Sequence, residues 1–209
     1  MLQVNKYVLG PLQTNCYIVN NKNNAIIIDP AYSPDFLAQL IHRNKYNLTA
    51  MVATHGHIDH VMAAGLLQKI YPVPFYIHKK DLFLLKNMVN LAKKYIEYID
   101  FIPIEPKKIK FLNEGTLHFG SITFNCFLAP GHTPGSCVLH NKQQKIAFVG
   151  DVVFKNGVGR YDFNYANKED LKKSIKKIKK LPKNTLLYPG HGNEFYISNI
   201  NTNELHQII

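Results

Sequence analysis

The sequence predicts an α+β protein in which two β-sheets carry helices on their outer sides. Short runs of β-branched and aromatic residues are numerous, and several of them follow one another as hairpins. Helical segments are interleaved with these runs, but too many strands are consecutive for a single doubly wound parallel sheet. No internal repeat or low-complexity linker interrupts the 209 residues, so we expect one domain over residues 1–209.

The N-terminal half is expected to combine strands with amphipathic helices. Asn and Lys turn residues separate the second strand from the third. The first helix starts with the typical pair Ser33 and Pro34, after which apolar residues recur at helical spacing. The expected strands are 2–9, 16–21, 23–29, 48–55 and 73–78, and the expected helices are 33–44, 61–70 and 79–98.

The C-terminal half is expected to consist mainly of strands, which Gly, Asn and Lys turns separate. One clear helix follows, in which lysines surround an apolar stripe. These lysines are expected to face solvent rather than nucleic acid or a membrane. The expected strands are 108–112, 115–120, 121–129, 137–141, 145–151 and 185–191, the helix is 168–181, and its stripe is Leu171, Ile175, Ile178 and Leu181.

The composition is that of a soluble globular protein, with 46% hydrophobic and 19% charged residues. No apolar run is long enough to cross a bilayer, and the N-terminus lacks the features of a secretory signal. Cys16, Cys126 and Cys137 are widely spaced, so neither a disulfide framework nor a cysteine-based zinc site is expected. We therefore expect a cytoplasmic protein without a membrane partner.

The chain is strongly basic, with 25 Lys and Arg residues, 14 Asp and Glu residues and a formal net charge of +11. Such a charge favours nucleic acid, a membrane surface or a small anionic substrate. However, the whole chain is rich in Lys, Asn and Ile, which indicates a general compositional bias. Aromatic and basic residues are not interleaved as in proteins whose aromatic side chains stack on the bases of single-stranded nucleic acid. Nucleic acid is therefore not expected as a partner.

The motif THGHIDH, Thr54–His60, directly follows a predicted buried strand. It contains four metal-binding side chains, those of His55, His57, Asp59 and His60. Imidazole nitrogens and carboxylate oxygens suit zinc, manganese or iron. Because a strand end holds side chains in fixed positions, a metal site is expected here.

Three later motifs add side chains of the same kind. APGHTPGS contains His132, FVGDVVF contains Asp151 and LLYPGHGNE contains His191, each at a strand end and directly after a glycine. Seven ligands are too many for one tetrahedral ion and suit two ions that share a bridge, for which an aspartate is the natural residue. Two neighbouring ions lower the pKa of a shared water, so the site is expected to be hydrolytic.

The motifs THGHIDH, GHTPGS, GD and GHG, in this order, resemble those of the metallo-β-lactamase superfamily. The similarity extends from GPLQTNCYIV and IIIDP to the C-terminal PGHG. It implies a four-layer αββα sandwich with two mixed β-sheets inside and helices outside. Within the superfamily the sequence looks most like the short bacterial glyoxalase II-type hydrolases, because GDVVFKNGVGRYDF has their Gly-x-Gly-Arg-x-Asp element.

The resemblance implies a role for each candidate residue. His55, His57 and His132 would bind the first metal, Asp59, His60 and His191 the second, and Asp151 would bridge the two ions. Zinc is expected, with iron and manganese as alternatives. Asp59 would also handle protons, and Asp29 would orient a ligand histidine, unless it only forms a turn with Pro30. Arg160 is a candidate for contact with an anionic substrate group, and a salt bridge with Asp162 is the alternative.

The activity that the resemblance implies is thioester hydrolysis. A hydroxide between the ions would attack the carbonyl, and the thiolate would leave with little protonation because thiols are fairly acidic. S-lactoylglutathione, or a related small anionic thioester, is the expected substrate. Full-length glyoxalase II enzymes have a C-terminal helical domain that helps to hold glutathione. It is not expected here, because only 18 residues follow His191.

Four alternatives stay open. A bridging Asp151 also suits a lactonase, whereas true β-lactamases of this fold lack that bridge. A persulfide dioxygenase shares much of the motif order but resembles a mononuclear iron enzyme that uses two histidines and the aspartate. A nuclease of the same fold is a more distant alternative, since no nuclease-type insertion is visible. A metal-binding protein without activity is disfavoured, because none of the seven positions is substituted.

Overall fold

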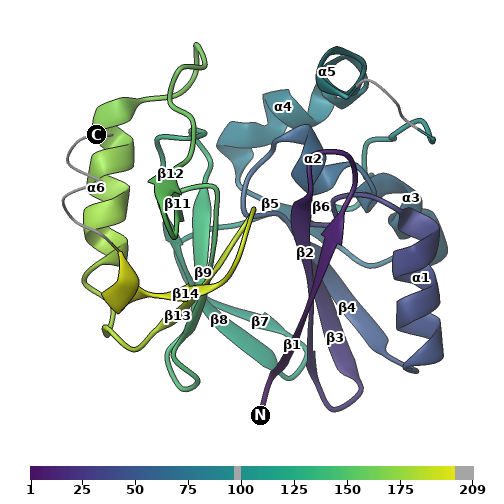
Figure 1. Cartoon of the computed structure of the whole chain (residues 1–209). Helices are drawn as coiled ribbons and strands as arrows, with labels where there is room; N and C mark the ends of the chain where they lie inside the picture. The colour runs from purple at the N-terminus through teal and green to yellow at the C-terminus, as the bar shows by residue number, and fades with distance from the viewer. Residues whose placement is uncertain (97–99, 201–209) are drawn as a thin grey trace.

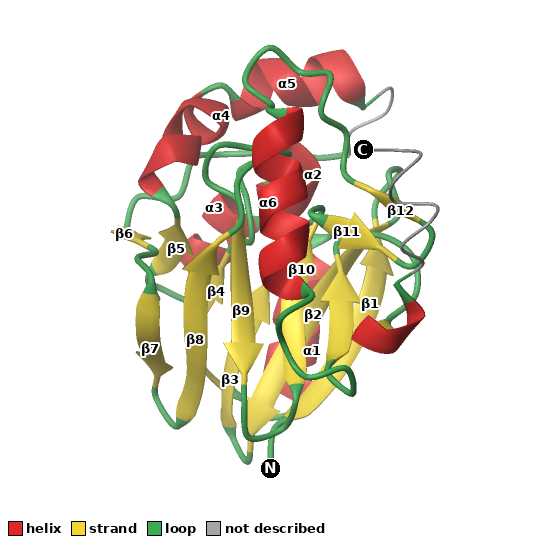
Figure 2. Cartoon of the chain, turned by 90° about the vertical axis from the view of Figure 1, so that its left-hand side faces the viewer, coloured by secondary structure: helices red, strands yellow, loops and turns green. Residues whose placement is uncertain are grey.

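The computed structural model describes residues 1–96 and 100–200, which are arranged in four layers (Figures 1 and 2). Two six-stranded sheets form the inner layers. Helices cover the outer face of each sheet, with α1 and α3 on one side and α6 on the other (Figure 1). The αββα sandwich predicted from the sequence is therefore confirmed.

The first sheet contains both antiparallel and parallel strand pairs. Its order is β1 (Gln3–Leu9), β2 (Thr14–Asn21), β3 (Asn24–Ile28), β4 (Asn47–Val52), β5 (Phe75–Ile77) and β6 (Ile109–Phe111). The pairs among β1, β2 and β3 are antiparallel, and those from β3 to β6 are parallel. Parallel neighbours need a crossover, which helices supply here. These helices are α1 (Pro34–Arg43), α2 (Ile58–Val61), α3 (Ala64–Ile70), α4 (Leu82–Lys86) and α5 (Met88–Tyr95).

The second sheet is antiparallel except for one pair. Its order is β14 (Phe195–Tyr196), β13 (Leu186–Pro189), β10 (Ile146–Gly150), β9 (Cys137–Asn141), β8 (Ile122–Leu128) and β7 (Gly115–Phe119). β10 and β13 are parallel, and α6 (Lys168–Ile178) lies between them in the chain. β11 (Val153–Phe154) and β12 (Gly157–Val158) form a separate hairpin after β10 that the sequence analysis did not predict.

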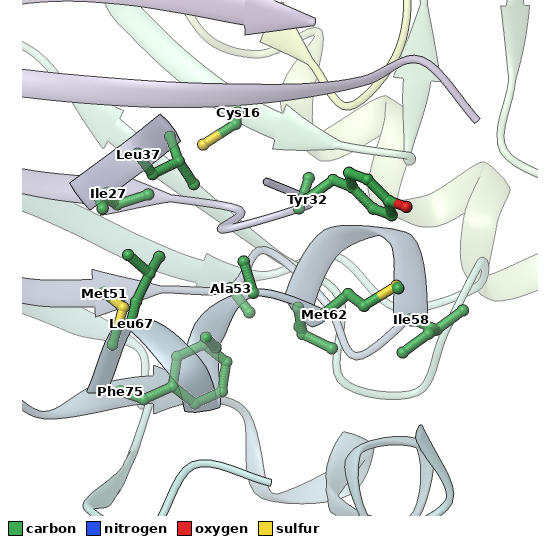
Figure 3. Packing of buried hydrophobic residues seen from close by; sticks show 14 of the residues in the cluster. Cys16, Ile27, Tyr32, Leu37, Met51, Ala53, Ile58, Met62, Leu67 and Phe75 are labelled. Carbon is green, nitrogen blue, oxygen red and sulfur yellow. The ribbon is translucent and has the colours of Figure 1, made fainter. Parts of the chain in front are cut away.

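The strands supply side chains to two cores at once, because successive residues of a strand point to opposite faces. In β3, Ile27 packs toward the helices of the first outer layer, while Ile26 and Ile28 pack between the sheets. In β10, Phe148 lies between the sheets and Val149 faces α6. Figure 3 shows Ile27 within the first of these cores, close to side chains from α1 and α3.

Helix α6 covers the second sheet with the apolar stripe that its sequence predicts. Leu171, Ile175 and Ile178 are buried, and Leu181 packs beside them just after the helix. The side chain of Asn167 caps the first turn by accepting a hydrogen bond from the backbone of Asp170 at 2.9 Å. None of the helices within residues 1–96 and 100–200 is both long and apolar enough to span a membrane.

The segment predicted to be helical over residues 79–98 is divided in the structure. It forms a 3₁₀ turn (Lys79–Asp81), then α4 and α5, with a break at Asn87. The backbone of Asn87 (φ −100°, ψ 12°) leaves the helical region. Asn has a low intrinsic helix propensity and favours helix ends, which fits a break at this position. Residues 97 and 98 lie outside the described residues.

The helix predicted over residues 61–70 begins earlier than expected and is interrupted. It starts as α2 at Ile58, inside the histidine motif, and resumes as α3 at Ala64. His57 is extended (φ −64°, ψ 146°) and precedes the first turn. Asp59 and His60 therefore lie on a helical turn rather than in a loop, which fixes their relative directions.

Gly131, in the loop after β8, contacts the start of α6 at a point where a side chain does not fit. Its φ is +134°, and its carbonyl oxygen accepts a hydrogen bond from the N–H of Asn167 at 2.8 Å. A Cβ would overlap the backbone of Leu171.

We expect Gly131→Ala to lower the free energy of unfolding by about 2 kcal/mol, as measured by urea denaturation. Gly157→Ala is the control, because a Cβ there meets nothing within 4 Å. Equal stabilities of the two variants would contradict this account.

Candidate metal centre

The seven candidate ligands meet where the two sheets end. His55 and His57 follow β4 of the first sheet, and Asp59 and His60 lie on α2. The second sheet supplies the others, since His132 comes after β8, Asp151 directly follows β10 and His191 comes after β13. Both sheets thus hold the ligands in place from opposite sides.

Three imidazole nitrogens converge in the first group. Nδ1 of His57 lies 3.1 Å from Nε2 of His55 and 2.9 Å from Nε2 of His132. A tetrahedral zinc ion with its nitrogen ligands at 2.0–2.1 Å would separate them by about 3.3 Å. The spacing of the three nitrogens is therefore close to that around a single ion.

The second group contains Asp59, His60 and His191, whose ligand atoms lie within 4.8 Å of one another. Oδ2 of Asp59 is 3.4 Å from Nε2 of His60 and 3.2 Å from Nε2 of His191. Asp151 lies between the two groups. One of its oxygens is 3.5 Å from His60, and the other is 3.6 Å from His132 and 3.5 Å from His191.

Two buried atoms of this cluster have no hydrogen-bond partner, namely Nε2 of His60 and Oδ1 of Asp151. Nδ1 of His60 lies 3.0 Å from a carboxylate oxygen of Asp29, which can only accept, so Nδ1 carries the hydrogen. In the neutral ring, Nε2 then presents a lone pair to Asp151. Two such acceptors are satisfied by a cation between them, which is either a proton on Nε2 or a metal ion, and nitrogen and oxygen donors without thiolate fit a divalent metal ion.

The charges of the cluster shift the pKa values of its members. Burial raises the pKa of Asp151, but His60, His191 and His132 together outweigh burial and hold that pKa at about 2. Burial lowers the pKa of His55 and lowers that of His57 to about 3, so both rings are neutral at neutral pH. Burial also opposes the charging of His60 and His191, yet the nearby carboxylates raise both pKa values. The carboxylate side of the cluster is therefore attractive to a cation.

Asp29, which was expected beside a ligand histidine, contacts His60 and the start of the histidine motif. Its carboxylate accepts hydrogen bonds from the N–H of Thr54 at 2.6 Å and from the Thr54 hydroxyl at 2.8 Å. Asp29 has a positive φ of 52°, a conformation that costs free energy in a non-glycine residue. These contacts fix the direction in which the His60 ring points.

Asp81 holds the two ligand loops together, and the sequence analysis missed it. Its buried carboxylate accepts hydrogen bonds from the N–H of Gly56 at 2.8 Å, the N–H of Gly135 at 2.7 Å and the hydroxyl of Thr133 at 2.7 Å. Gly56 belongs to the histidine motif, whereas Thr133 and Gly135 belong to the loop of His132. No local motif marks Asp81, because its partners are distant in the sequence.

Tyr165 was also missed, and Arg160 contacts the cluster differently from what was expected. The hydroxyl of Tyr165 lies 2.9 Å from Nε2 of His57. The guanidinium of Arg160 donates to both carboxylate oxygens of Asp162 at 2.8 and 2.9 Å, which is the predicted salt-bridge alternative. It is the carbonyl oxygen of Arg160 that meets the cluster, where it accepts a hydrogen bond from Nδ1 of His132 at 2.8 Å.

A cavity of about 410 Å³ opens beside the cluster. Its floor includes five of the candidate ligands, and apolar and aromatic side chains form most of the remaining wall. This volume is typical of small-molecule sites. The five ligands that face the cavity are His57, Asp59, His132, Asp151 and His191.

Comparisons with known proteins agree with this geometry. Hydroxyacylglutathione hydrolase GloC of Haemophilus influenzae is 36% identical over 186 residues, which are 86% of each chain. The solved structure of TTHA1623 in a di-iron-bound form matches with a TM-score of 0.86 and 32% identity, over 95% of this chain and 99% of that one. The B3 metallo-β-lactamase BLEG-1 matches with a TM-score of 0.85 and 31% identity, over 95% of each chain.

A model of one family covers most of the chain. It describes the metallo-β-lactamase superfamily and matches residues 9–191, a range that includes all seven candidate ligands and Asp29. The solved structures of similar sequence have the same four-layer fold. This chain therefore belongs to the metallo-β-lactamase superfamily.

Proposed function

We propose that this protein is a metal-dependent hydrolase that cleaves small acyl thioesters, as enzymes of the glyoxalase II type do. The observation that carries the proposal is the position of Asp151 between two groups of ligand atoms, on the floor of a cavity of ligand size. The hydroxyacylglutathione hydrolase that is 36% identical supports a thioester as the substrate. The net charge of +11 supports a substrate with a negative charge.

We assign the ligands to two divalent ions. His55, His57 and His132 would hold one ion, Asp59, His60 and His191 the other, and Asp151 would bridge them. Zinc suits this nitrogen-rich set, and the relative solved with two iron ions supports iron as the alternative. When bound, such ions act as Lewis acids and lower the pKa of a coordinated water.

Hydrogen bonds made by the atoms that point away from the cluster hold the ligand side chains in position. Nδ1–H of His132 donates to a backbone carbonyl and Nδ1–H of His60 faces the Asp29 carboxylate, so both rings direct Nε2 at the centre. The hydroxyl of Thr14 donates to Asp59 at 2.8 Å and fixes its carboxylate. Asp59 also lines the cavity, and its role in handling protons stays a prediction.

The cysteines support the cytoplasmic location that we propose. All three are buried thiols without a disulfide, as is typical in a reducing compartment. We propose a small molecule as the partner, and neither a membrane nor nucleic acid.

The first test is hydrolysis of S-D-lactoylglutathione by zinc-loaded protein. We expect kcat/KM of about 10⁴ M⁻¹s⁻¹ or more, and loss of that activity after chelation of the metal. The release of free thiol measures the reaction. A negligible rate would remove glutathione thioesters as the substrate, and lactone and persulfide substrates would be tested next.

A second candidate function is β-lactam hydrolysis, because a protein described as a B3 metallo-β-lactamase is 31% identical over 95% of this chain. A chromogenic cephalosporin assayed with the same preparation separates the two functions. Our proposal requires the thioester to be hydrolysed with the higher kcat/KM.

Asp151→Ala should lose at least one metal equivalent and nearly all hydrolysis, because it removes the carboxylate that faces both ligand groups. Elemental analysis of the purified variant measures the bound metal. Asp35→Ala is the matched control, since Asp35 is an exposed carboxylate on α1. Two metal equivalents and full activity in Asp151→Ala would overturn the bridging assignment.

Tyr165→Phe should weaken metal binding by about tenfold while the ring and its packing are retained. As an acceptor from Nε2–H of His57, the hydroxyl leaves Nδ1 of that ring unprotonated and free to bind an ion. Competition with a chelator measures the dissociation constant of the metal. Tyr95→Phe is the control, because Tyr95 lines the same cavity. Equal metal affinities in the two variants would show that this hydrogen bond does not position His57.

A further inference from the structure

The cavity wall beyond the ligand cluster is apolar and aromatic, although its residues come from four separate segments of the chain. The segments are the turn after β1, helix α5, the β11–β12 hairpin and the loop before α6. Their principal side chains are Leu12, Leu91, Tyr95, Phe154, Phe163 and Tyr165.

Aromatic rings border the ligand cluster on two sides. The rings of Phe163 and Tyr165 are stacked, with centroids 5.3 Å apart, and the ring of Phe163 lies 5.1 Å from that of His57. On the other side, the ring of Phe154 lies 6.3 Å from that of His191. A substrate group bound in the cavity at the cluster would therefore lie next to these rings.

Helix α5 presents apolar residues to the cavity and places its lysines elsewhere. Leu91 and Tyr95 are four residues apart and share one face of the helix. Lys93 and Lys94 are exposed and do not line the cavity, although the Lys94 ammonium lies 5.1 Å from the centre of the Tyr95 ring. Tyr95 is 45% exposed and Leu12 is 42% exposed, so large apolar side chains border the opening. Exposed apolar surface next to a cavity is typical of a binding site for an apolar group.

The charges of the cavity do not suit an anionic group along this wall. Arg160 is the one Lys or Arg that lines the cavity within the described part of the chain. Its guanidinium is already bound to both oxygens of Asp162 and lies 4.4 Å from the centre of the Phe163 ring. Because this ion pair offsets the charge of Arg160, its guanidinium attracts a substrate carboxylate less strongly than an unpaired one would, whereas an uncharged group needs no such partner.

We infer that the substrate group lying in this cavity is uncharged and apolar, such as a straight-chain acyl or alkyl group of several carbons next to the thioester. The inference rests on the proposed function, because water cleaves the C–S bond of such a thioester into a carboxylic acid and a thiol. In a glutathione thioester, the two carboxylates would then lie outside this wall. The net charge of +11 would then attract the substrate as it approaches the protein, but would not bind it within the cavity.

Two series of thioesters test the inference with the zinc-loaded protein. In one, the acyl group on N-acetylcysteamine is lengthened from acetyl to butanoyl and hexanoyl. In the other, acetyl thioesters of ethanethiol, butanethiol and hexanethiol are compared. We expect kcat/KM to rise about three- to fourfold per added methylene group in at least one series, and the series that rises identifies the side of the thioester that the cavity holds. Values that stay flat or fall in both series would overturn the inference.

Variants of the wall connect the effect to these residues. Leu91→Ser and the more exposed Tyr95→Ser should reduce the ratio of kcat/KM between the longest and the shortest member of the rising series at least threefold. Phe111→Ser is the control, because Phe111 is 46% exposed on β6 and does not line the cavity. An equal change in all three variants would show that the wall does not select the substrate.

A binding measurement keeps the inference separate from the proposed function. Calorimetry gives the dissociation constants of butanoate, hexanoate and octanoate, which are straight-chain acids of the type that the acyl series releases. Tighter binding with chain length supports an apolar cavity even if no thioester is hydrolysed, a result that would remove only the thioesterase proposal. Equal dissociation constants together with no hydrolysis would remove both.

Discussion

The balance of buried charge at the ends of the two sheets is the constraint on which the site depends. Asp59 and Asp151 are largely buried among imidazoles at the edge of the cavity, and an uncompensated buried carboxylate costs several kcal/mol. His60 is fully buried, and its Nε2 faces Asp151 without a hydrogen bond. A divalent cation resolves this arrangement, because it accepts lone pairs from both atoms. Metal binding would therefore stabilise this end of the molecule.

Two further buried carboxylates hold the ligands from outside. Asp29 connects the end of β3 with Thr54 after β4 and with His60 on α2. Asp81 connects the histidine motif with the loop that carries His132, and so links ligands of the first sheet to ligands of the second. Each carboxylate makes several hydrogen bonds, which restrain the loops. The ligand geometry thus follows from the rigid sandwich rather than from the loops alone.

The ligand cluster and the cavity wall bear on different aspects of function, the cluster on the reaction and the wall on the substrate. The cluster indicates the chemistry, and two relatives of similar identity, one named a hydroxyacylglutathione hydrolase and one a B3 metallo-β-lactamase, show how little overall identity says about the substrate. The wall is built by side chains such as Leu12, Tyr95 and Phe163, which lie in turns, on a short helix and in a loop around the cluster. If the protein has the proposed function, these connecting segments would select the substrate, whereas the residues at the strand ends would carry out the reaction.

The sequence by itself determined the layers and the candidate ligands. A short continuous apolar run such as Ile26–Ile28 is typical of a strand buried on both faces, and the histidine motif is compact enough to stand out. Only the tertiary structure revealed Asp81, the backbone role of Arg160 and the contact of Tyr165 with His57, two residues 108 positions apart. Local spacing reports which face of a strand or helix a side chain occupies. Contacts between distant segments leave no such period, because the packing of the whole sandwich brings them together.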